Sequence, residues 1–530
     1  MNFDLPYISG RQPVLGRNVV STSQPLAAQA GATAFAHGGN AVDAALAAAI
    51  TLTVVEPVMN GIGGDAFALI WDGKRLNGLN SSGRSPAAWT PDRFKGMESM
   101  PMRGWDSVTV PGQVAGWVAL SEKYGRLPFE DLFADAIIHA RQGFPVSPVI
   151  ARQWDQSVRD LHTFPGFSEF MPRGRAPKAG EIWKFEAQAK TLHDIARTRG
   201  ESFYRGRLAE AICTFAGEHG AALSLSDLAN HQPEWVTPIS TTFRGHEIHE
   251  IPPNGQGLAA LIAIGLLEQL PLEDFKRGSA QRMHLEIEAM RLAFADLQAY
   301  VADPAHMQIR ASDLLDPQYL KRRAREIDLK HAGNHGPGKP TSGGTVYLCT
   351  ADAEGMMVSY IQSNYRGFGS GVVVPGTGIS LHNRGSGFVT TPGHANQVDG
   401  NKKPLHSIIP AFMTKGGEPL MAFGVMGGNM QAQGHTQMVM RRVLEGSNPQ
   451  ACSDAPRWRI NDTADLTLEP TVSSAVIDEL RAMGHTPQVL TPDNLDFGSA
   501  QLIEKLPTDD GSAAYVAGSD HRRDGQAVAC

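Results

Sequence analysis

Cysteine is scarce in this chain, with only four among its 530 residues. They stand at positions 213, 349, 452 and 530, and no two have the C-x-x-C spacing of a zinc site or a redox pair. Disulfide frameworks are typical of short secreted domains, which this long chain is not. We therefore expect inert or buried thiols in a reducing compartment.

Two further absences narrow the range of partners. The formal net charge is -7, which gives no reason to expect nucleic acid or an acidic membrane as a partner. The most promising apolar stretch, residues 41–55, contains Asp43 and is short for a membrane span. The first seven residues show no basic segment followed by an apolar run, so we expect no secretory signal peptide and a cytoplasmic protein.

What the chain does have is length and many turn-forming residues, with 56 glycines and 34 prolines. A chain of 530 residues is too long for one small core, so it forms two or three domains or one large layered domain. Hydrophobic periodicity and capping residues predict the individual elements. These are a helix at 41–50 capped by Asn40, a β-rich run at 51–55, helices over 111–145, a long helix from Ser279 to Asp303, further helices at 429–444 and 476–483, and strands at 67–71, 346–350, 357–363 and 420–425.

A glycine-rich segment leads into Thr345. Residues 333–344 contain five glycines and two prolines, which is typical of a mobile surface loop where cleavage is easy. If the bond between Gly344 and Thr345 were cut, Thr345 would carry a free α-amine with an ordinary pKa of about 7.7–8.0 beside its own hydroxyl. Such an amine is the base that a threonine nucleophile needs. The alternative is a plain loop that enters a strand, which the short Gly-Gly-Thr motif also fits.

Self-cleavage at this bond requires few groups. The Thr345 hydroxyl attacks the Gly344 carbonyl, the acyl group moves from nitrogen to oxygen, and water hydrolyses the ester. Gly427 and Gly428, between a predicted strand and helix, offer backbone N–H groups for an oxyanion hole, although a tight turn would look the same. Arg84 stands among small residues that permit close approach, so its guanidinium could bind a carboxylate of the substrate. The alternative is a solvated side chain, which is usual for an arginine in a turn.

These separate motifs together resemble one known family over nearly the whole chain, the γ-glutamyltransferase family of N-terminal-nucleophile hydrolases. The resemblance implies an α/β fold, specifically a four-layer αββα sandwich. It also implies that the chain cuts itself into a large subunit, residues 1–344, and a small subunit, residues 345–530, which form one intertwined unit. The motifs that carry it lie at residues 38–45, 83–86, 110–116, 368–371, 403–407, 426–428, 454–457 and 518–520.

The resemblance assigns roles to residues one by one. Thr345 matches the nucleophile, and Gly427 and Gly428 match the glycines of the oxyanion hole. Arg84 matches the arginine that grips the substrate carboxylate. Ser363 falls where the family commonly has a threonine that hydrogen-bonds the nucleophile, so a hydroxyl is retained there.

Other positions depart from the family pattern. Ser407 matches the second member of a serine pair near the substrate, but His406 replaces the first. Tyr365 stands where an asparagine is common, and Asn364 could replace that asparagine only through a shift of one residue. We still expect these four side chains near the substrate.

The most informative departure is Gly387. Transferases of the family carry an aspartate there that pairs with the α-ammonium group of the substrate. Here residues 382–388 contain no carboxylate, and Arg384 adds a cation. Because losing a charged partner in a shielded site costs about 2–5 kcal/mol, we expect a small-molecule amide that has a carboxylate but no glutamyl amino group.

Several substrates fit that description. The first candidate is oxamate, hydrolysed to oxalate and ammonia, because His406, Tyr365 and Arg384 are bulky enough to shorten the pocket and the chain most resembles the oxamate amidohydrolases. A glutaryl amide, of the kind cut by cephalosporin-acylase-like members, is an alternative. γ-Glutamyl hydrolysis or transfer does not fit that description but stays open as a further alternative.

Other interpretations compete with this one. Residues 61–66 fit a GxGxxA pattern, but a strand rather than the required helix follows. His284 and Glu288 stand four apart on the long helix, yet without a third ligand we expect a solvated helix face, and neither a metal nor a cofactor. An uncleaved relative that binds small carboxylates without turnover stays open, as does a homo-oligomer.

Overall fold

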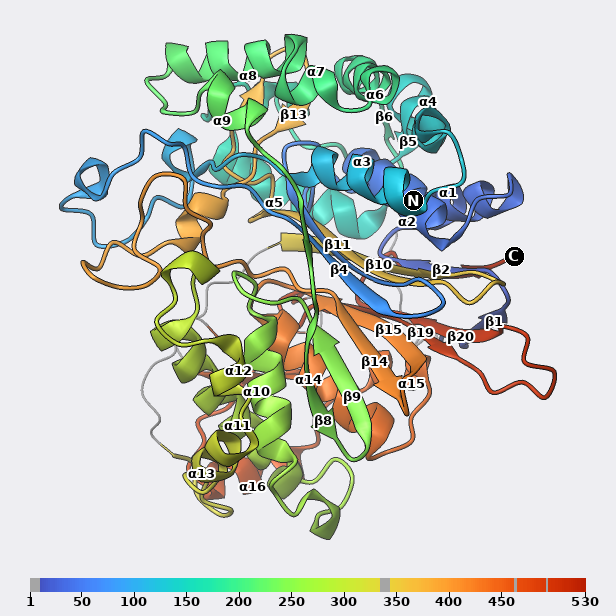
Figure 1. Cartoon of the computed structure of the whole chain (residues 1–530), viewed down its shortest axis with the longest axis vertical. Coiled ribbons are helices and arrows are strands. Elements are labelled where there is room, and N and C mark those ends of the chain that lie inside the picture. Colours follow the sequence, from blue (N-terminus) through green and yellow to red (C-terminus); the bar gives the residue numbers. More distant parts are fainter. Residues whose placement is uncertain (1–9, 334–343, 462–464, 492–493) are drawn as a thin grey trace.

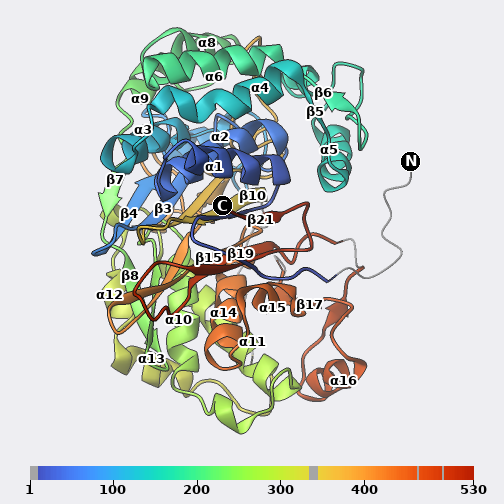
Figure 2. The ribbon, with the colours of Figure 1, turned by 90° about the vertical axis from the view of Figure 1, so that its right-hand side faces the viewer.

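Two seven-stranded antiparallel sheets lie face to face between two layers of helices (Figure 1). This is a computed structural model, and it describes residues 10–333, 344–461, 465–491 and 494–530. Turned by 90°, the molecule shows the layers in sequence, with α1 to α9 above the sheets and α10, α11 and α14 to α16 below them (Figure 2). The four-layer αββα sandwich expected from the sequence is confirmed.

The strands of each sheet come from distant parts of the chain. The first sheet has the order β21 (Gln526–Ala529), β2 (Val19–Thr22), β10 (Gly344–Ala351), β11 (Met357–Tyr365), β3 (Asp65–Trp71), β4 (Leu76–Ser81) and β7 (Glu234–Val236). The second has the order β1 (Val14–Gly16), β20 (Tyr515–Ser519), β19 (Ser499–Lys505), β15 (Glu418–Met426), β14 (Ala411–Lys415), β9 (His246–Glu250) and β8 (Ile239–Phe243).

Helices cover the outer face of each sheet. Above the first sheet lie α1 (Pro25–Ala36), α2 (Ala41–Val55), α3 (Gln113–Tyr124), α4 (Ala134–Gln142), α5 (Pro148–Leu161), α6 (Glu186–Thr198), α7 (Glu201–Tyr204), α8 (Arg207–Glu218) and α9 (Leu225–Ala229). Below the second lie α10 (Gly257–Leu267), α11 (Ala280–Tyr300), α12 (Ala311–Leu314), α13 (Pro317–Ala324), α14 (Met430–Val443), α15 (Pro449–Asp454) and α16 (Ser474–Ala482). Short strand pairs and triplets complete the fold: β5 (Phe144–Pro145) with β6 (Ile182–Trp183), β12 (Val373–Val374) with β13 (Ile379–Ser380), and β16 (Trp458–Ile460) with β17 (Leu466–Leu468) and β18 (Gln488–Val489).

Strand β3 shows how the core is divided between the layers. Successive side chains of a strand point to opposite faces of the sheet. Ala68 and Ile70 therefore pack under the upper helices, whereas Phe67 and Leu69 pack in the core between the two sheets. Every residue of β3 is buried, as expected for a strand covered on both faces.

Helix α2 corrects one sequence prediction. The β-rich run at 51–55 is not a strand, because α2 continues through it to Val55. A capping box starts the helix: the Asn40 side chain accepts from the N–H groups of Val42 and Asp43, and the Asp43 carboxylate accepts from the Asn40 N–H. All fifteen residues of α2 are buried, so tertiary packing overrides the β preference of the threonines and valines.

Most other predicted elements are confirmed to within a few residues. Ser279 caps α11, its hydroxyl accepting from the N–H of Arg282 at 3.3 Å. The strands predicted at 67–71, 346–350, 357–363 and 420–425 are β3, β10, β11 and β15, the helices at 429–444 and 476–483 are α14 and α16, and residues 111–145 hold α3 and α4. The loop predicted at 333–344 lies outside the described residues, except for Gly333 and Gly344.

The polar pair on α11 corrects a second prediction. His284 and Glu288 do not face solvent but are completely buried. His284 Nδ1 lies 2.8 Å from Nε2 of His485, and its Nε2 lies 2.7 Å from the carbonyl oxygen of Asp328. Glu288 pairs with Arg291 at 2.8 Å. These contacts join α11 to the chain after α16, and His485, 201 positions further on, gave no local signal in the sequence.

Among the described residues, no helix combines the length and the apolar character that crossing a bilayer requires.

Candidate active site

Thr345 lies at the start of β10, completely buried and between two hydrogen-bonding side chains. Its hydroxyl donates to Ser363 Oγ on β11 at 3.3 Å and accepts from Gln431 Nε2 on α14 at 3.3 Å. The pairing of β10 with β11 is irregular between Gly344 and Val346. Such an irregularity can re-aim a side chain next to a site, and here it falls at Thr345.

A glycine turn follows β15 close to Thr345. Gly427 and Gly428 have φ angles of +126° and +64°, a region that favours glycine. A Cβ on Gly427 would also lie 3.0 Å from the Cα of Gly498. The turn opens α14, whose first-turn residue Gln431 reaches the Thr345 hydroxyl. Backbone N–H groups at such a helix start suit an oxyanion.

Gln256, just before α10, ties this turn to a second loop. Its Nε2 donates to the carbonyl oxygens of Gly428, at 2.8 Å, and of Ser407. Its backbone N–H donates to the carbonyl of His406 at 2.9 Å. The glycine turn and the loop that carries His406 and Ser407 are therefore held in one fixed arrangement.

Arg384 is the central charge of the site. Its side chain is fully buried, its Nη1 donates to Ser407 Oγ at 2.8 Å, and its guanidinium lies 4.6 Å over the ring of Tyr365. Among the described residues, its Nε and Nη2 atoms have no hydrogen-bond partner. Burial lowers the pKa of Arg384 to about 10, so the group stays charged at neutral pH.

Tyr365 is held in an unusual conformation beneath this cation. Its φ is +77°, which is uncommon for a residue other than glycine. Its N–H donates to Ser363 Oγ at 2.7 Å. A strained backbone conformation persists only where the surroundings hold the residue in place. Tyr365 is held by its contacts with the Ser363 hydroxyl and with the guanidinium of Arg384.

A cavity of about 320 Å³ opens at Arg384, and we call it the Arg384 cavity. Its polar lining residues include Tyr365, Arg384, His406 and Ser407. Its apolar lining residues are Phe294, Leu297, Val301, Phe388, Val389 and Leu405. None of the described residues that line the cavity is acidic. The described lining therefore combines one buried cation with apolar and polar side chains.

His406 is neutral, and a hydrogen bond to Asp65 fixes its ring. Burial and the charge of Arg384 hold the pKa of His406 well below its usual value. Its Nε2 donates to Asp65 Oδ2 at 3.1 Å, and Asp65 Oδ1 accepts from the N–H of Gly112 at 2.9 Å. Burial raises the pKa of Asp65 to about 7, although the nearby charge of Arg384 opposes this rise.

The structure does not bring two of the expected residues to the cavity. Arg84 is 42% exposed, and its Nη1 donates to Asp303 at 2.9 Å. The small residues beside it make room for the chain rather than for a ligand, since a Cβ on Gly83 would lie 1.6 Å from the carbonyl oxygen of Val110. Asn364 is buried, but its Nδ2 donates to Ser380 Oγ at 2.8 Å, and it does not line the cavity.

The remaining expected residues gather around the cavity and the glycine turn. Gly387 lines the cavity, as the sequence interpretation requires. Gln431, Gln256 and Asp65 were not singled out from the sequence. Only Gln431 had a signal, because the predicted helix at 429–444 begins right after the two glycines and places Gln431 in its first turn.

The four-layer sandwich, with a threonine opening a central strand beside a glycine turn, defines the class of N-terminal-nucleophile hydrolases. The chain belongs to the γ-glutamyltranspeptidase family, whose model matches residues 27–530. It is accordingly a self-processing, amide-hydrolysing enzyme of that class.

Three similar proteins illustrate the breadth of the family. The glutathione hydrolase-like YwrD proenzyme of Bacillus subtilis is 35% identical over 529 residues, covering 97% of this chain and 100% of that protein. The oxamate amidohydrolase proenzyme of Klebsiella pneumoniae is 35% identical over 496 residues, covering 91% and 93%. The crystal structure of a cephalosporin acylase from Bacillus halodurans matches with 44% identity and a TM-score of 0.94, covering 100% and 99%.

Proposed function

We propose that this enzyme cuts itself between Gly344 and Thr345 and then hydrolyses amides whose acyl group ends in a carboxylate, through an acyl-enzyme on Thr345. The carboxylate is bound by Arg384. The observation that carries the proposal is the buried guanidinium of Arg384, which lines the cavity and has two buried donor atoms without a hydrogen-bond partner in the described part of the chain. A guanidinium fork fits a carboxylate with two parallel hydrogen bonds.

The first step is the cut. Thr345 Oγ attacks the Gly344 carbonyl and passes its proton to the departing amide nitrogen, which gives an ester, and water then hydrolyses that ester. Ser363 and Gln431 support this step, because each is within hydrogen-bonding distance of the attacking oxygen. The products are a carboxylate on Gly344 and an α-amine on Thr345.

In turnover the new α-amine takes the proton of the Thr345 hydroxyl. The oxygen attacks the substrate carbonyl, and the N–H groups of the Gly427–Gly428 turn stabilise the developing oxyanion. The amine half leaves with the proton. Water then attacks the acyl-enzyme, activated by the same α-amine, and releases the acid.

A γ-glutamyl substrate fits this cavity poorly. Its α-ammonium group would need a counter-charge, and the described lining residues offer no carboxylate. Arg384 would repel it across a medium that screens little. Asp65, the acidic group behind the lining, is already engaged with His406 and Gly112.

The shape of the cavity favours an acyl group longer than that of oxamate. Although Tyr365, Arg384 and His406 are bulky, about 320 Å³ remain, with an apolar wall along α11. Oxamate has no methylene group to place on that wall, whereas a glutaryl group has three. We therefore put glutaryl-type amides first. Oxamate stays as a second candidate because of the similarity, over nearly the whole chain, to an oxamate amidohydrolase.

The proposal is tested first by the cut itself. The purified protein should give two bands in denaturing electrophoresis, and the smaller should begin Thr-Val-Tyr-Leu. Thr345→Ala should leave one band without activity, and Thr345→Ser should keep both properties in part. A single full-length band in an active preparation would refute the mechanism, and one in an inactive preparation would favour an uncleaved binding protein.

The acyl group is tested with a matched pair of substrates. Glutaryl-p-nitroanilide and γ-glutamyl-p-nitroanilide differ only in the α-amino group. We expect kcat/KM to favour the glutaryl compound by roughly thirtyfold or more, since an unpaired ammonium group in a shielded site costs about 2–5 kcal/mol. Ammonia release from oxamate and from glutaramate ranks the two remaining candidates. Preference for the γ-glutamyl compound would contradict the assignment.

A further inference from the structure

Gln431, in the first turn of α14, holds a hydrogen bond to the oxygen on which the proposed reaction takes place. Its Nε2 lies 3.3 Å from Thr345 Oγ. Its Oε1 accepts from the backbone N–H of Ile409 at 2.9 Å. A backbone N–H can only donate, so the atom that it contacts is the amide oxygen and the end that reaches Thr345 is the NH2 group. The contact with Ile409 therefore fixes Gln431 as a donor to Thr345 Oγ.

The two neighbours of the Thr345 hydroxyl have different roles. The hydroxyl donates its proton to Ser363 Oγ, and that oxygen also accepts from the N–H of Tyr365 at 2.7 Å. Ser363 thus receives the proton of the hydroxyl, whereas Gln431 donates to the oxygen itself. Among the residues that the structure describes, Gln431 is the one side chain that donates to Thr345 Oγ.

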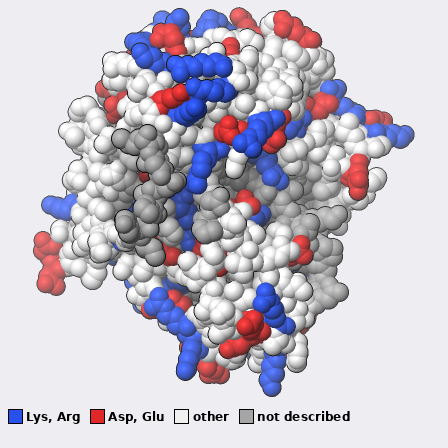
Figure 3. Space-filling view, turned by 180° about the vertical axis from the view of Figure 1, so that it is seen from behind, with Lys and Arg blue, Asp and Glu red and all other residues white. Residues whose placement is uncertain are grey.

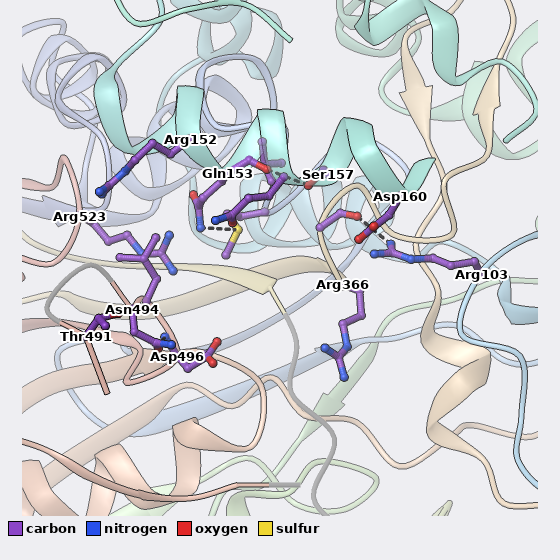
Figure 4. Close-up of a pocket in the computed structure, with 16 residues that line it drawn as sticks. Arg103, Arg152, Gln153, Ser157, Asp160, Arg366, Thr491, Asn494, Asp496 and Arg523 are labelled. Carbon is purple, nitrogen blue, oxygen red and sulfur yellow. Dashed lines mark hydrogen bonds between the residues drawn. The ribbon is translucent and has the colours of Figure 1, made fainter. Parts of the chain in front are cut away.

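This donor is shielded from water. Figure 3 shows a hollow near the middle of one face, bordered by Lys and Arg side chains. A cavity of about 470 Å³ under α5 also reaches the glycine turn, where Gly427 lines it (Figure 4). Gln431 is completely buried and lines neither this cavity nor the Arg384 cavity. In such surroundings a donor beside a developing negative charge stabilises it more than it would in water.

Thr345 Oγ becomes negative whenever an ester on it is broken. The proposed function contains two such esters, one with Gly344 during the cut and one with the substrate acyl group in turnover. In each, water adds to the ester carbonyl, the bond from that carbon to Oγ breaks, and the α-amine returns the proton of the water to Oγ. Oγ gains negative charge while the bond breaks, and an N–H donor at Oγ stabilises that charge.

We propose that Gln431 is a catalytic hydrogen-bond donor that stabilises Thr345 Oγ as the leaving group in both ester hydrolyses. It keeps its own protons throughout, so it is neither the acid nor the base of the reaction. The inference rests on the proposed function, because it needs an acyl group on Thr345. A purely structural role, in which the amide only ties α14 to the chain at Ile409, predicts different results.

An activated ester separates the two halves of turnover. Glutaryl p-nitrophenyl ester has a good leaving group, so its first turnover appears as a burst and its steady-state rate reports hydrolysis of the acyl-enzyme. Gln431→Met keeps the length of the side chain without a donor. We expect the steady-state rate to fall about ten- to hundredfold and the burst rate to fall less, because a hydrogen bond to a charged group is lost. Mass spectrometry should find the glutaryl group on the small subunit. Equal slowing of both phases, or slowing of neither, would overturn the inference.

The matched control is Gln433→Met on the same helix. Gln433 is also completely buried, its Nε2 donates to the carbonyls of Asn429 and Ile460, and its Oε1 accepts from the N–H of Ile460 at 2.7 Å. Losing these bonds should lower the free energy of unfolding but leave the ratio of burst to steady-state rate unchanged. The same change of ratio in this control would assign the effect to α14 as a whole and contradict the proposed role of Gln431.

Gln431→Glu gives a readout that a structural role would not move. One carboxylate oxygen can still accept from Ile409, but the other donates to Thr345 only when the group is protonated. Burial raises the pKa of such a carboxyl, so protonation falls within a measurable range. The ratio of variant to wild-type steady-state rates should therefore rise about tenfold or more from about pH 8 to about pH 6. A low ratio that does not change with pH would refute the donor role.

The ester of the cut offers a measurement without any substrate. Hydroxylamine cleaves an ester at neutral pH much faster than an amide. A Gln431→Met chain that stalls at the Gly344 ester should split before Thr345 on brief treatment, whereas Thr345→Ala should stay whole. This result supports the inference even if no glutaryl compound is hydrolysed, and the same treatment supplies cut Gln431→Met for the ester assay.

Two outcomes of that treatment count against Gln431. Self-cleavage of Gln431→Met at the wild-type rate would overturn the inference, and so would a full-length band that resists hydroxylamine. A wild-type chain that is itself never cut would instead refute the proposed function, so the two failures are distinguishable.

Discussion

Arg84 and Arg384 carry the same charge in opposite surroundings. Arg84 follows β4, is 42% exposed and is bound to Asp303. Arg384 is buried, has two donor atoms without a described partner and lines a cavity. An exposed, paired guanidinium must give up water and a partner before it binds a ligand, whereas burial has already removed most of the water from Arg384. We therefore expect substrate recognition to depend on which donor atoms the fold leaves unpaired, and a local motif does not reveal that.

The largest effect on activity is expected from replacing Arg384 itself. Arg384→Gln removes the charge but keeps a long polar side chain. We expect kcat/KM for a glutaryl amide to fall roughly a hundredfold or more, because a buried charge pair with the substrate is lost. Self-cleavage, followed by electrophoresis, should persist. Loss of cleavage together with activity would show that Arg384 has a structural role instead.

A second variant asks whether the missing counter-charge decides the substrate. Gly387→Asp should raise the γ-glutamyl over glutaryl ratio of kcat/KM about tenfold or more, since an ammonium group gains a partner beside the cavity. A Cβ there would lie 2.5 Å from the carbonyl oxygen of Leu405, so some loss of total activity is also expected. Gly387→Ala has the same Cβ without the charge and isolates that steric cost. A ratio equal in the two variants would rule out the charge explanation.

A third variant leaves Arg384 in place and removes the hydroxyl that accepts its hydrogen bond. Ser407→Ala removes the acceptor of the Nη1 bond, so the guanidinium is held less firmly. KM for the glutaryl amide should rise about three- to tenfold, with kcat changed less, because one hydrogen bond to a charged group is lost. Ser386→Ala is the control, since Ser386 lines the same cavity but donates to the Asn383 carbonyl. A fall in kcat alone would contradict this view.

The smallest effect is expected at Arg84. Arg84→Gln should change kcat/KM by less than about twofold and lower the free energy of unfolding in urea by about 1 kcal/mol or less, as for an exposed ion pair. It serves as the matched control for Arg384→Gln. A large rise in KM would show that Arg84 takes part in substrate binding, which would contradict the distinction drawn between the two arginines.

The four layers were predicted from the resemblance to a known family, which also suggested the candidate site residues, whereas hydrophobic alternation, glycine turns and capping residues are local signals and predicted the individual helices and strands. The strand predicted at 51–55 was wrong, since full burial in α2 outweighs local preference. His284 was misjudged because its partner His485 is distant in the sequence. Gln256 was missed for a similar reason, as a glutamine that bonds two backbone carbonyls has no signature of its own.

The position of β10 and β11 in the first sheet has one more consequence. These strands follow Gly344 yet lie between β2 and β3, so the first sheet has no continuous centre until they are inserted. Neither piece left by the proposed cut before Thr345 has a complete first sheet of its own, so we expect the uncut polypeptide to be the unit that folds. The proposed cut would then act on a folded protein, and the backbone hydrogen bonds of β10 with β2 and of β11 with β3 would keep the two pieces together.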